Sequence, residues 1–314
     1  MDKSTLDKPI KITEQFWPKN ICPLVSVFSW VYNHKEFIVE SIESILIQET
    51  TFPIEIIIHD DASTDGTAEI IRSYEKKYPN ILFKNILHQE NQWSQGKSVM
   101  NPLFEKPQGK YIALTHGDDY WTDPLKLQKQ VDFLEANEEY SMSFHDAIYL
   151  DMQTGKKSEF VSKFNSEREC KTKDIILADG EIYPTASLVF RTDMLDLPKW
   201  SKHSSGDYTL FLLLSVKGKI HNFNEFMSTY RTNVPGSLTS IWKQATNKRK
   251  LKIAFKTIKR KRQNQKMLLS FNKYTHNRYL FYVAIKVLHE EYLVLRHLAV
   301  TFVIETLRKL RILT

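Results

Sequence analysis

Residues 110–121, KYIALTHGDDYW, contain a short apolar run that ends in two adjacent carboxylates. Such a run is typical of a strand buried within a sheet. Two neighbouring carboxylates at the end of a buried strand are costly to desolvate unless a cation compensates for them. A hard divalent cation does so, and it also binds diphosphate oxygens. Asp118 and Asp119 are therefore candidate ligands for Mg²⁺ or Mn²⁺ beside a nucleoside diphosphate.

A second interpretation gives this acidic segment a structural role. The following residues 122–137, TDPLKLQKQVDFLEAN, have the pattern of a helix, and Thr122 or Asp123 before Pro124 is a suitable cap. Capping explains Asp123. It gives no reason for the acidic pair that precedes it.

On both sides of this segment, short apolar runs alternate with amphipathic segments from Leu24 to about Ser158. This alternation predicts repeated βα units and a mainly parallel sheet. The expected strands are residues 23–32 (PLVSVFSWVY), 52–60 (FPIEIIIHD), 81–88 (ILFKNILH) and 110–118 (KYIALTHGD), with a helix over residues 35–49. Further along, residues 141–151 and 219–231 resemble strands and residues 207–216 a helix. We expect an N-terminal extension (1–21), one α/β domain (22–239) and a helical tail (240–314).

Polar residues follow two more of the expected strands. Ligands of open α/β sheets bind just beyond the carboxyl ends of the strands. Tyr32-Asn33-His34 follows the first strand, and Asp60-Asp61-Ala62-Ser63-Thr64-Asp65-Gly66-Thr67 follows the second. Asp61 is suited to accept hydrogen bonds from a ribose or from the imide N–H of uracil, whereas residues 64–66 read better as an Asx turn and helix cap. Both interpretations stay open for Asp60.

Taken together, the Tyr-Asn, Asp-Asp-x-Ser-x-Asp-Gly-Thr and Gly-Asp-Asp-x-Trp segments, each after an apolar strand, resemble family 2 glycosyltransferases of bacterial surface-polysaccharide pathways. The resemblance covers about residues 22–235. It implies a GT-A fold: a Rossmann-like, mixed but mainly parallel sheet with helices on both faces, here followed by a C-terminal helical extension. It also implies an enzyme that uses a nucleotide-sugar donor and a divalent metal.

The resemblance assigns roles to individual residues. Asp61 would contact the base or ribose, Tyr32 would lie against the uracil-like ring, and Asp118 with Asp119 would form the DxD-type site for metal and donor. Lys97 is the best match for an electropositive residue near the donor. A solvated lysine at the start of a helix is an equal interpretation of Lys97.

Downstream, the resemblance points to Asp207, ahead of an apolar helix, as the base that takes the proton from the acceptor hydroxyl. A helix cap is the alternative. Arg231 would face phosphate or form a structural salt bridge, and Asn233 stands where the family has a metal-binding histidine. Trp30 replaces a smaller polar residue, which indicates an altered donor pocket.

These assignments predict an inverting transfer of a sugar from a nucleotide-sugar, with a UDP-sugar expected, to an acceptor hydroxyl in the synthesis of cell-surface polysaccharide, lipopolysaccharide or capsule. Two alternatives remain. A sugar-phosphate nucleotidylyltransferase uses a related sheet, but its Gly-rich phosphate loop does not occur near residues 24–36. A non-catalytic nucleotide-sugar-binding subunit of a polysaccharide assembly complex would keep the donor site and need no base at Asp207.

Residues 240–314 contain 18 Lys or Arg against 3 Asp or Glu, a net charge of +15 within a chain of +7 overall. The run over residues 247–262 interleaves these charges with apolar residues, which is the pattern of a helix on an anionic membrane surface. Phe281, Leu288, Tyr292, Leu295, Ala299 and Phe302 form one approximate stripe further on. Nucleic-acid binding, packing against a partner subunit and a plain solvated charge run are the competing interpretations. Since no nucleic-acid-binding motif is present, nucleic acid ranks last.

Several features of the sequence bear on where in the cell the protein is located. Residues 1–20 lack the apolar core of a secretory signal, and no uncharged stretch approaches the roughly 20 residues that span a bilayer. Cys22 and Cys170 show no spacing for a disulfide framework or a zinc site. We therefore expect a cytoplasmic protein, peripherally associated with the inner face of the membrane, that acts on a saccharide or lipid-linked acceptor. His116, His145 and His221 lack a second ligand at suitable spacing and are expected to be structural.

Overall fold

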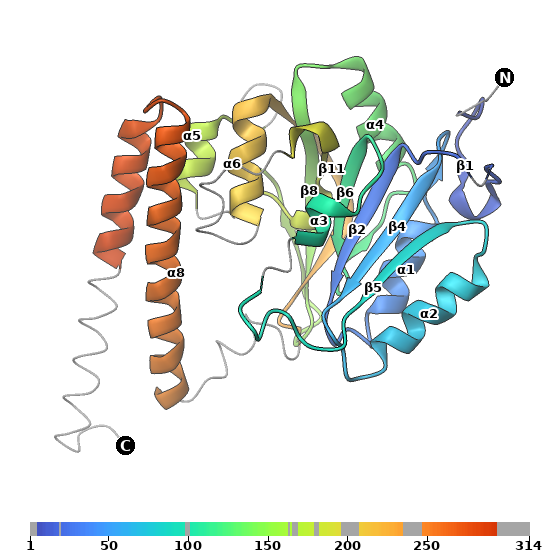
Figure 1. Cartoon of the computed structure of the whole chain (residues 1–314), viewed down its shortest axis with the longest axis horizontal. Helices are drawn as coiled ribbons and strands as arrows, with labels where there is room; N and C mark the ends of the chain where they lie inside the picture. The colour runs from blue at the N-terminus through green and yellow to red at the C-terminus, as the bar shows by residue number, and fades with distance from the viewer. Residues whose placement is uncertain are drawn as a thin grey trace.

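The computed structural model describes residues 5–18, 20–97, 101–162, 164, 169–178, 182–195, 207–234 and 247–293. Within them, nine strands form one sheet at the centre of the molecule (Figure 1). These strands are β2 (Val25–Val31), β4 (Ile54–Asp60), β5 (Leu82–Leu87), β6 (Tyr111–His116), β7 (Tyr120–Trp121), β8 (Tyr140–Asp151), β9 (Lys157–Phe160), β10 (Val189–Arg191) and β11 (Lys219–Thr232). The sheet order is β5-β4-β2-β6-β10-β8-β11-β7, and β9 pairs with β8.

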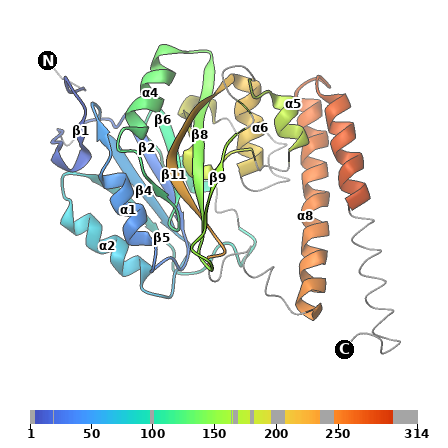
Figure 2. The ribbon, with the colours of Figure 1, turned by 180° about the vertical axis from the view of Figure 1, so that it is seen from behind.

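Helices cover both faces of this sheet (Figures 1 and 2). Those described are α1 (Ile38–Leu46), α2 (Thr67–Lys77), α3 (Asn101–Glu105), α4 (Lys126–Ala136), α5 (Thr172–Leu177), α6 (Asp207–Lys217) and α8 (Asn247–Tyr274), with short 3₁₀ turns η1 (Ile12–Glu14), η2 (Thr185–Ser187) and η3 (Thr192–Met194). A further helix occupies residues 280–293. Helices α1, α2 and α4 pack on one face and α5 and α6 on the other, and α8 joins the same core from beyond α5 and α6 (Figure 1).

The four strands expected from the apolar runs form the parallel half of the sheet, β5-β4-β2-β6. The other half is mixed. Strand β10 runs antiparallel to both β6 and β8, whereas β11 runs parallel to β8. The expectation of a mixed, mainly parallel sheet with helices on both faces is confirmed.

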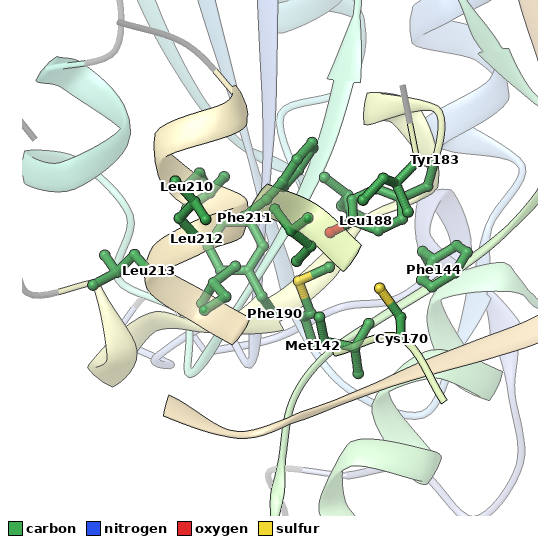
Figure 3. Close-up of a cluster of buried hydrophobic side chains, with 14 of the residues drawn as sticks. Met142, Phe144, Cys170, Tyr183, Leu188, Phe190, Leu210, Phe211, Leu212 and Leu213 are labelled. Atoms are coloured by element: carbon green, nitrogen blue, oxygen red, sulfur yellow. The ribbon is translucent and has the colours of Figure 1, made fainter. Parts of the chain in front are cut away.

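Alternate residues of the central strands serve the two faces, because side chains in a strand point to opposite sides in turn. Val27 and Ile56 are fully buried in the core beneath α1, α2 and α4. Their neighbours Phe28 and Ile57 are fully buried in the opposite core. Figure 3 shows that second core, where side chains of α6 meet those of β8 and β10. Burial on both faces explains why these strands are continuous apolar runs.

Residues 5–18, within the expected N-terminal extension, lie against the domain. Strand β1 (Ile10–Lys11) pairs with β3 (Glu49–Thr50) in a small antiparallel sheet. The side-chain amide of Gln15 donates to the carbonyl oxygens of Ile10 (3.1 Å) and Thr50 (2.7 Å). Gln15 itself is buried, so this segment is anchored to the domain by satisfied buried hydrogen bonds.

Helix α8 and the helix over residues 280–293 stand side by side at the edge of the molecule, beyond α5 and α6 (Figures 1 and 2). We call this pair the C-terminal hairpin. The expected helical tail is confirmed over residues 247–293, whereas Leu295, Ala299 and Phe302 lie outside the described residues. None of the described helices has an apolar stretch long enough to cross a bilayer.

Candidate functional site

The register of the parallel strands brings three loops to one edge of the sheet. Trp30 pairs with His116, and Val31 pairs with Asp60. Backbone hydrogen bonds extend this alignment past the strand ends. The N–H of Gly117 donates to the carbonyl oxygen of Trp30 (2.9 Å), and the N–H of Asp61 donates to that of Val31 (3.0 Å). The loops after β2, β4 and β6 are therefore immediate neighbours, as the sequence predicts.

Hydrogen bonds from the backbone and from the Asn33 side chain attach the loop after β2 to the loop after β4. The N–H of Asn33 donates to Ser63 Oγ (2.7 Å), and Asn33 Oδ1 accepts from the N–H of Thr64 (2.8 Å). The N–H of Lys35 donates to Asp65 Oδ2 (3.0 Å). Asn33 has a positive φ of 54°, which asparagine tolerates better than most residues. This docking leaves the neighbouring Tyr32 with 47% of its surface exposed at the mouth of the site.

The acidic pair after β6 has one deeply buried member. Asp119 is 1% exposed, and its Oδ1 accepts a hydrogen bond from the backbone N–H of Arg231 (2.9 Å). Among the described residues, Asp119 Oδ2 has no hydrogen-bond partner; it lies 3.8 Å from Nδ1 of His116. Asp118 is more open, and its Oδ2 lies 3.8 Å from Nε2 of His34. Neither carboxylate points into bulk solvent away from the neighbouring loops.

Burial controls the charge of this pair. Desolvation, helped by the charge of Asp118, raises the pKa of Asp119 to about 6 even though His116 opposes the shift. Burial by itself would lower the pKa of His116, but the adjacent Asp119 carboxylate raises it to about 9. The Asp119 carboxylate thus favours the protonated imidazole of His116, while Asp119 Oδ2 still lacks a hydrogen bond.

An unsatisfied, buried carboxylate oxygen beside a second carboxylate suits a divalent cation. No group of three or more His, Cys, Asp or Glu side chains is arranged to hold a metal within the described ranges. Mg²⁺ sites commonly take one or two protein carboxylates and complete their shell with phosphate oxygens and water. Asp118 and Asp119 fit a site of that kind, in which the ligand supplies part of the coordination.

Asp207 begins α6 on the same side of the sheet as the acidic pair. Its Oδ2 accepts a hydrogen bond from Thr185 Oγ1 in η2 (2.6 Å), which fixes the carboxylate. The charge of Asp207 raises the pKa of His116, as do those of Asp118 and Asp119. Burial and then the same three carboxylates raise the pKa of Tyr230. Asp207 thus lies within electrostatic reach of the groups around the acidic pair.

Asp61 is buried under the loop that follows β5. Its Oδ1 accepts from the backbone N–H of Gln92 (2.6 Å) and its Oδ2 from that of Trp93 (3.1 Å). Lys97 lies in the same loop, where its N–H donates to the carbonyl oxygen of Gln92 (3.0 Å), and its side chain is exposed. The structure therefore places Asp61 and Lys97 on one loop assembly, with the large ring of Trp93 57% exposed beside them.

The other polar residues of the loop after β4 have structural partners. Asp60 accepts hydrogen bonds from the backbone N–H (3.1 Å) and hydroxyl of Ser63, which form a turn. Asp65 Oδ1 accepts from the N–H of Thr67 at the start of α2 (3.0 Å). Asp65 has the turn and capping role expected of it, and Asp60 is committed to a turn as well.

Arg231, at the end of β11, fixes the position of the loop that contains Asp118 and Asp119. Its Nη1 donates to the carbonyl oxygen of Asp118 (2.6 Å), and its guanidinium forms a salt bridge with Glu40. The same guanidinium lies 4.6 Å from the ring centre of Tyr120. These contacts support the structural interpretation of Arg231. The amide of Asn233 donates to Asp151 Oδ2 (2.6 Å).

Sequence reasoning set His116 aside as structural, yet it lies within the site. The position at the end of a buried strand, two residues before the acidic pair, is the signal that could have found it. His145 and His221 have ordinary surroundings: Nδ1 of His145 bonds the carbonyl oxygen of Asp146 (2.7 Å), and the His221 ring stacks on Phe133. The Trp30 ring lies 5.5 Å from the His116 ring, so this departure from the family pattern is next to the candidate site, and an altered donor pocket stays a prediction.

A cavity of about 570 Å³ lies at the opposite, amino-terminal edge of the strands. Its lining includes Leu24, Gly109, Lys110 and Asp193 but none of the predicted site residues. It lacks the paired carboxylates and the strand-end loops described above. The candidate site residues lie instead at the carboxyl edge of the sheet.

Residues 26–193 match the family described as Glycosyl transferase family 2. This span is more than half of the 314-residue chain and contains the three loops of the site. The chain belongs to glycosyl transferase family 2. The resemblance drawn from the strand-end motifs is confirmed.

Curated proteins similar to this family 2 glycosyltransferase include an uncharacterized protein of Mycobacterium tuberculosis, which is 38% identical over 72% of this chain and 63% of its own length. The chain thus spans less than two thirds of that relative. A putative teichuronic acid biosynthesis glycosyltransferase of Bacillus subtilis is 31% identical over 71% of this chain and 84% of its own. The UDP-Glc:alpha-D-GlcNAc-diphosphoundecaprenol beta-1,3-glucosyltransferase WfaP of Escherichia coli is 30% identical over 69% of this chain and 80% of its own.

Solved structures share the fold of this family 2 glycosyltransferase at low sequence identity. Residues 1–349 of S. aureus TarS in complex with UDP-GlcNAc align with a TM-score of 0.53 and 17% identity, over 87% of this chain and 79% of that one. The mannosyltransferase PcManGT from Pyrobaculum calidifontis, in complex with GDP-Man and Mn²⁺, aligns with a TM-score of 0.50 and 16% identity, over 80% of this chain and 64% of that one. The GT-A fold expected from the sequence is confirmed.

Proposed function

We propose that this family 2 glycosyltransferase is an inverting, metal-dependent enzyme that moves a sugar from a UDP-sugar to an acceptor hydroxyl in cell-surface polysaccharide synthesis. The observation that carries the proposal is the arrangement around His116. The charges of the acidic pair and of Asp207 all act on this one half-buried imidazole, while Tyr32 and Asp61 occupy the adjoining strand ends. A base site, a diphosphate site and a proton acceptor then follow one another along one edge of the sheet.

The donor would lie across the carboxyl ends of β2, β4 and β6. Tyr32 is exposed and fits the face of a uracil ring, and Asp61 fits the imide N–H or ribose. Lys97, on the loop bound to Asp61, would neutralise donor phosphate. Arg231 contributes by holding the carbonyl of Asp118, which keeps the acidic loop in position.

In the transfer step, the acceptor oxygen bonds to the anomeric carbon as the bond from that carbon to the diphosphate oxygen breaks. Asp207 takes the proton of the attacking hydroxyl, and the nucleoside diphosphate leaves from the opposite face, which inverts the configuration. Thr185 orients Asp207 through the 2.6 Å hydrogen bond to its Oδ2. Asp118 and Asp119 would hold a divalent ion, which would supply Lewis-acid stabilisation of the negative charge on the leaving group.

Mn²⁺ or Mg²⁺ is the proposed cofactor. The buried, unsatisfied Oδ2 of Asp119 supports it, as does the Mn²⁺ bound with GDP-Man in the structural neighbour from P. calidifontis. A UDP-sugar is favoured over other donors by the uracil-type contacts expected of Asp61 and by the UDP-GlcNAc bound to TarS.

The proposed acceptor is a saccharide or a lipid-linked saccharide, reached from the cytoplasmic face of the membrane. The name of the E. coli relative specifies a diphosphoundecaprenol-linked acceptor, and that of the B. subtilis relative specifies teichuronic acid synthesis. The basic C-terminal hairpin would associate peripherally with the anionic inner leaflet.

The test is a donor screen that measures nucleotide release with Mn²⁺, with Mg²⁺ and with a chelator, combined with three variants. Asp207→Asn is expected to abolish transfer while UDP affinity, measured by calorimetry, stays unchanged. Asp119→Ala is expected to weaken metal-dependent UDP binding. Asp193→Asn, an exposed carboxylate at the opposite edge of the sheet, is the matched control and should behave as wild type.

The two alternative functions give different outcomes. A non-catalytic sugar-nucleotide-binding subunit would bind UDP but release no nucleotide from any donor, with or without Asp207. A nucleotidylyltransferase would release pyrophosphate from a nucleoside triphosphate, an activity that the family match disfavours. Wild-type transfer rates in both the Asp207→Asn and Asp119→Ala proteins would overturn the proposed function.

A further inference from the structure

The helix over residues 280–293 exposes its apolar side chains. Phe281 is 70% exposed, Ile285 41%, Leu288 69% and Tyr292 61%. Their spacing of four, three and four residues places them on one face of a helix. We call these four residues the apolar stripe. Surface hydrophobic residues scattered singly need no explanation, but an aligned row of four marks an interaction surface.

The opposite face of the same helix buries charged groups against α8. Lys286 is 4% exposed and Glu290 2%. Glu290 accepts from Lys261 of α8 (Nζ to Oε2, 2.7 Å) and lies 3.3 Å from Lys286 Nζ, and Glu291 pairs with Arg262 of α8. The inner face of this helix therefore combines buried ion pairs with the buried Val283, while the apolar stripe faces outward.

These ion pairs fix the rotation of the helix. Turning the apolar stripe inward would expose or separate Glu290 and its lysine partners, and a buried charge that loses its partner is strongly destabilising. The hairpin itself is attached to the domain, since Phe271 of α8 and Val283 are fully buried in the core shared with α5 and α6. The apolar stripe is thus presented outward by a rigidly attached element.

The basic charge of the neighbouring helix α8 indicates which kind of partner would cover the apolar stripe. Helix α8, beside it, contains 11 Lys or Arg and no Asp or Glu. Two copies of this hairpin placed stripe to stripe would bring two strongly basic helices together. An anionic lipid surface instead attracts the basic residues and accepts the apolar side chains at the boundary between headgroups and acyl chains.

We propose that the apolar stripe is the surface by which the protein docks on an anionic bilayer, with the basic residues of α8 supplying attraction alongside it. This inference deepens the membrane association included in the proposed function and does not depend on catalysis. It moves the inserted face from the run over residues 251–258, which the sequence pattern favours, to residues 281–292. The four side chains of the apolar stripe within that segment are exposed.

The test is flotation of the full chain with vesicles of phosphatidylcholine alone or with 30% phosphatidylglycerol. The variant is Phe281→Ser with Leu288→Ser. The matched control is Phe16→Ser with Val161→Ser, which removes two apolar side chains elsewhere that are also more than half exposed. Wild type and control should float with the anionic vesicles only, and the stripe variant should show a partition coefficient lower by about tenfold or more. Circular dichroism checks that all three proteins have the same fold and melting temperature.

Two outcomes would overturn the inference. One is equal flotation of wild type and stripe variant. The other is a wild-type dimer in sedimentation velocity that the stripe variant converts to a monomer, with vesicle binding unaltered, which would assign the stripe to a second copy of the chain. Nucleotide release from a UDP-sugar, measured in the same samples without vesicles, separates these outcomes from failure of the proposed function, because the stripe variant should release nucleotide at the wild-type rate.

Discussion

Asp119, beside His116, is a residue whose burial lowers the stability of the folded protein. At the end of β6 the Asp119 side chain is taken out of water and the His116 ring is half-buried beside it; only one oxygen of Asp119 is satisfied by a hydrogen bond, from the Arg231 backbone. A buried polar atom without a partner is unfavourable in the folded protein. A bound cation would satisfy the unpaired oxygen of Asp119 and offset this unfavourable free energy, which is the physical basis for proposing the cation at this position.

The buried imidazole of His59 in β4 makes the stability of the fold depend on pH. Burial, and then the charge of His88, lower the pKa of His59 to about 4, and the two Nε2 atoms are 2.9 Å apart. In the unfolded chain this pKa is about 6.5. Between these two values the unfolded chain binds a proton that the folded chain refuses, so stability falls as the pH is lowered, by at most about 1.4 kcal/mol per pH unit.

We therefore expect His59→Gln to show a weaker loss of unfolding free energy than wild type between pH 6.5 and 4, measured by urea denaturation. His289→Gln, an exposed histidine, is the control and should follow wild type. A His59→Gln protein with the wild-type pH dependence would show that His59 is not held neutral.

At the scale of elements, the loop over residues 88–97 depends on one carboxylate. Asp61 accepts the N–H groups of both Gln92 and Trp93. Asp61→Asn keeps the shape but turns one acceptor into a donor and removes the charge, and hydrogen bonds to charged groups contribute about 1.5–3 kcal/mol. We expect amide exchange in residues 88–97 to accelerate by about tenfold or more in hydrogen–deuterium exchange mass spectrometry. Asp65→Asn, which affects Lys35 and Thr67 instead, should leave this loop unchanged.

The elements differ in how far the sequence predicts them. Strands β2, β4, β5 and β6 and helices α1 and α4 follow from apolar runs and helical spacing, because local periodicity reports burial directly. Strand β10 has only three residues, and its place between β6 and β8 depends on contacts with distant parts of the chain. Its antiparallel insertion, and so the change of direction within the sheet, was not predictable from a local pattern.

The same distinction holds for the site. Tyr32, Asp61, Asp118 and Asp119 come together because strand ends of a parallel sheet share an edge, which the order of motifs already implies. Asp207 required the family resemblance, since it comes from the other half of the chain. The partners Thr185 and His116 required coordinates. Whether each residue has its assigned chemical role stays a prediction.

For the whole molecule, the C-terminal hairpin is part of the fold and not a detachable tail. Phe271 is fully buried in the core shared with α5 and α6, whereas Leu269, two residues earlier, is 49% exposed. Phe271→Ala should cost about 3–5 kcal/mol of unfolding free energy, the usual range for a buried aromatic. Leu269→Ala should stay within about 0.5 kcal/mol of wild type.

Chemical denaturation measures both changes. If Phe271→Ala and Leu269→Ala were equally mild, the hairpin would be folding independently of the domain, and its attachment through this core would be refuted. A large loss in Phe271→Ala alone would mean that deleting residues 247–314 destabilises the protein, so membrane binding is better studied with surface substitutions than with truncation.

The commitment of both Asp61 oxygens to a loop has a consequence for donor recognition. Asp61 is only 5% exposed beneath this loop, so a uracil imide N–H that donates to its carboxylate would need the loop to lift. We therefore expect only the fraction of molecules with the loop lifted to be competent to bind. The apparent dissociation constant is then the intrinsic one divided by that fraction. If Asp61 contacts the donor as proposed, we expect nucleotide affinity to depend on how often residues 88–97 open as well as on the contacts made once the donor is in place.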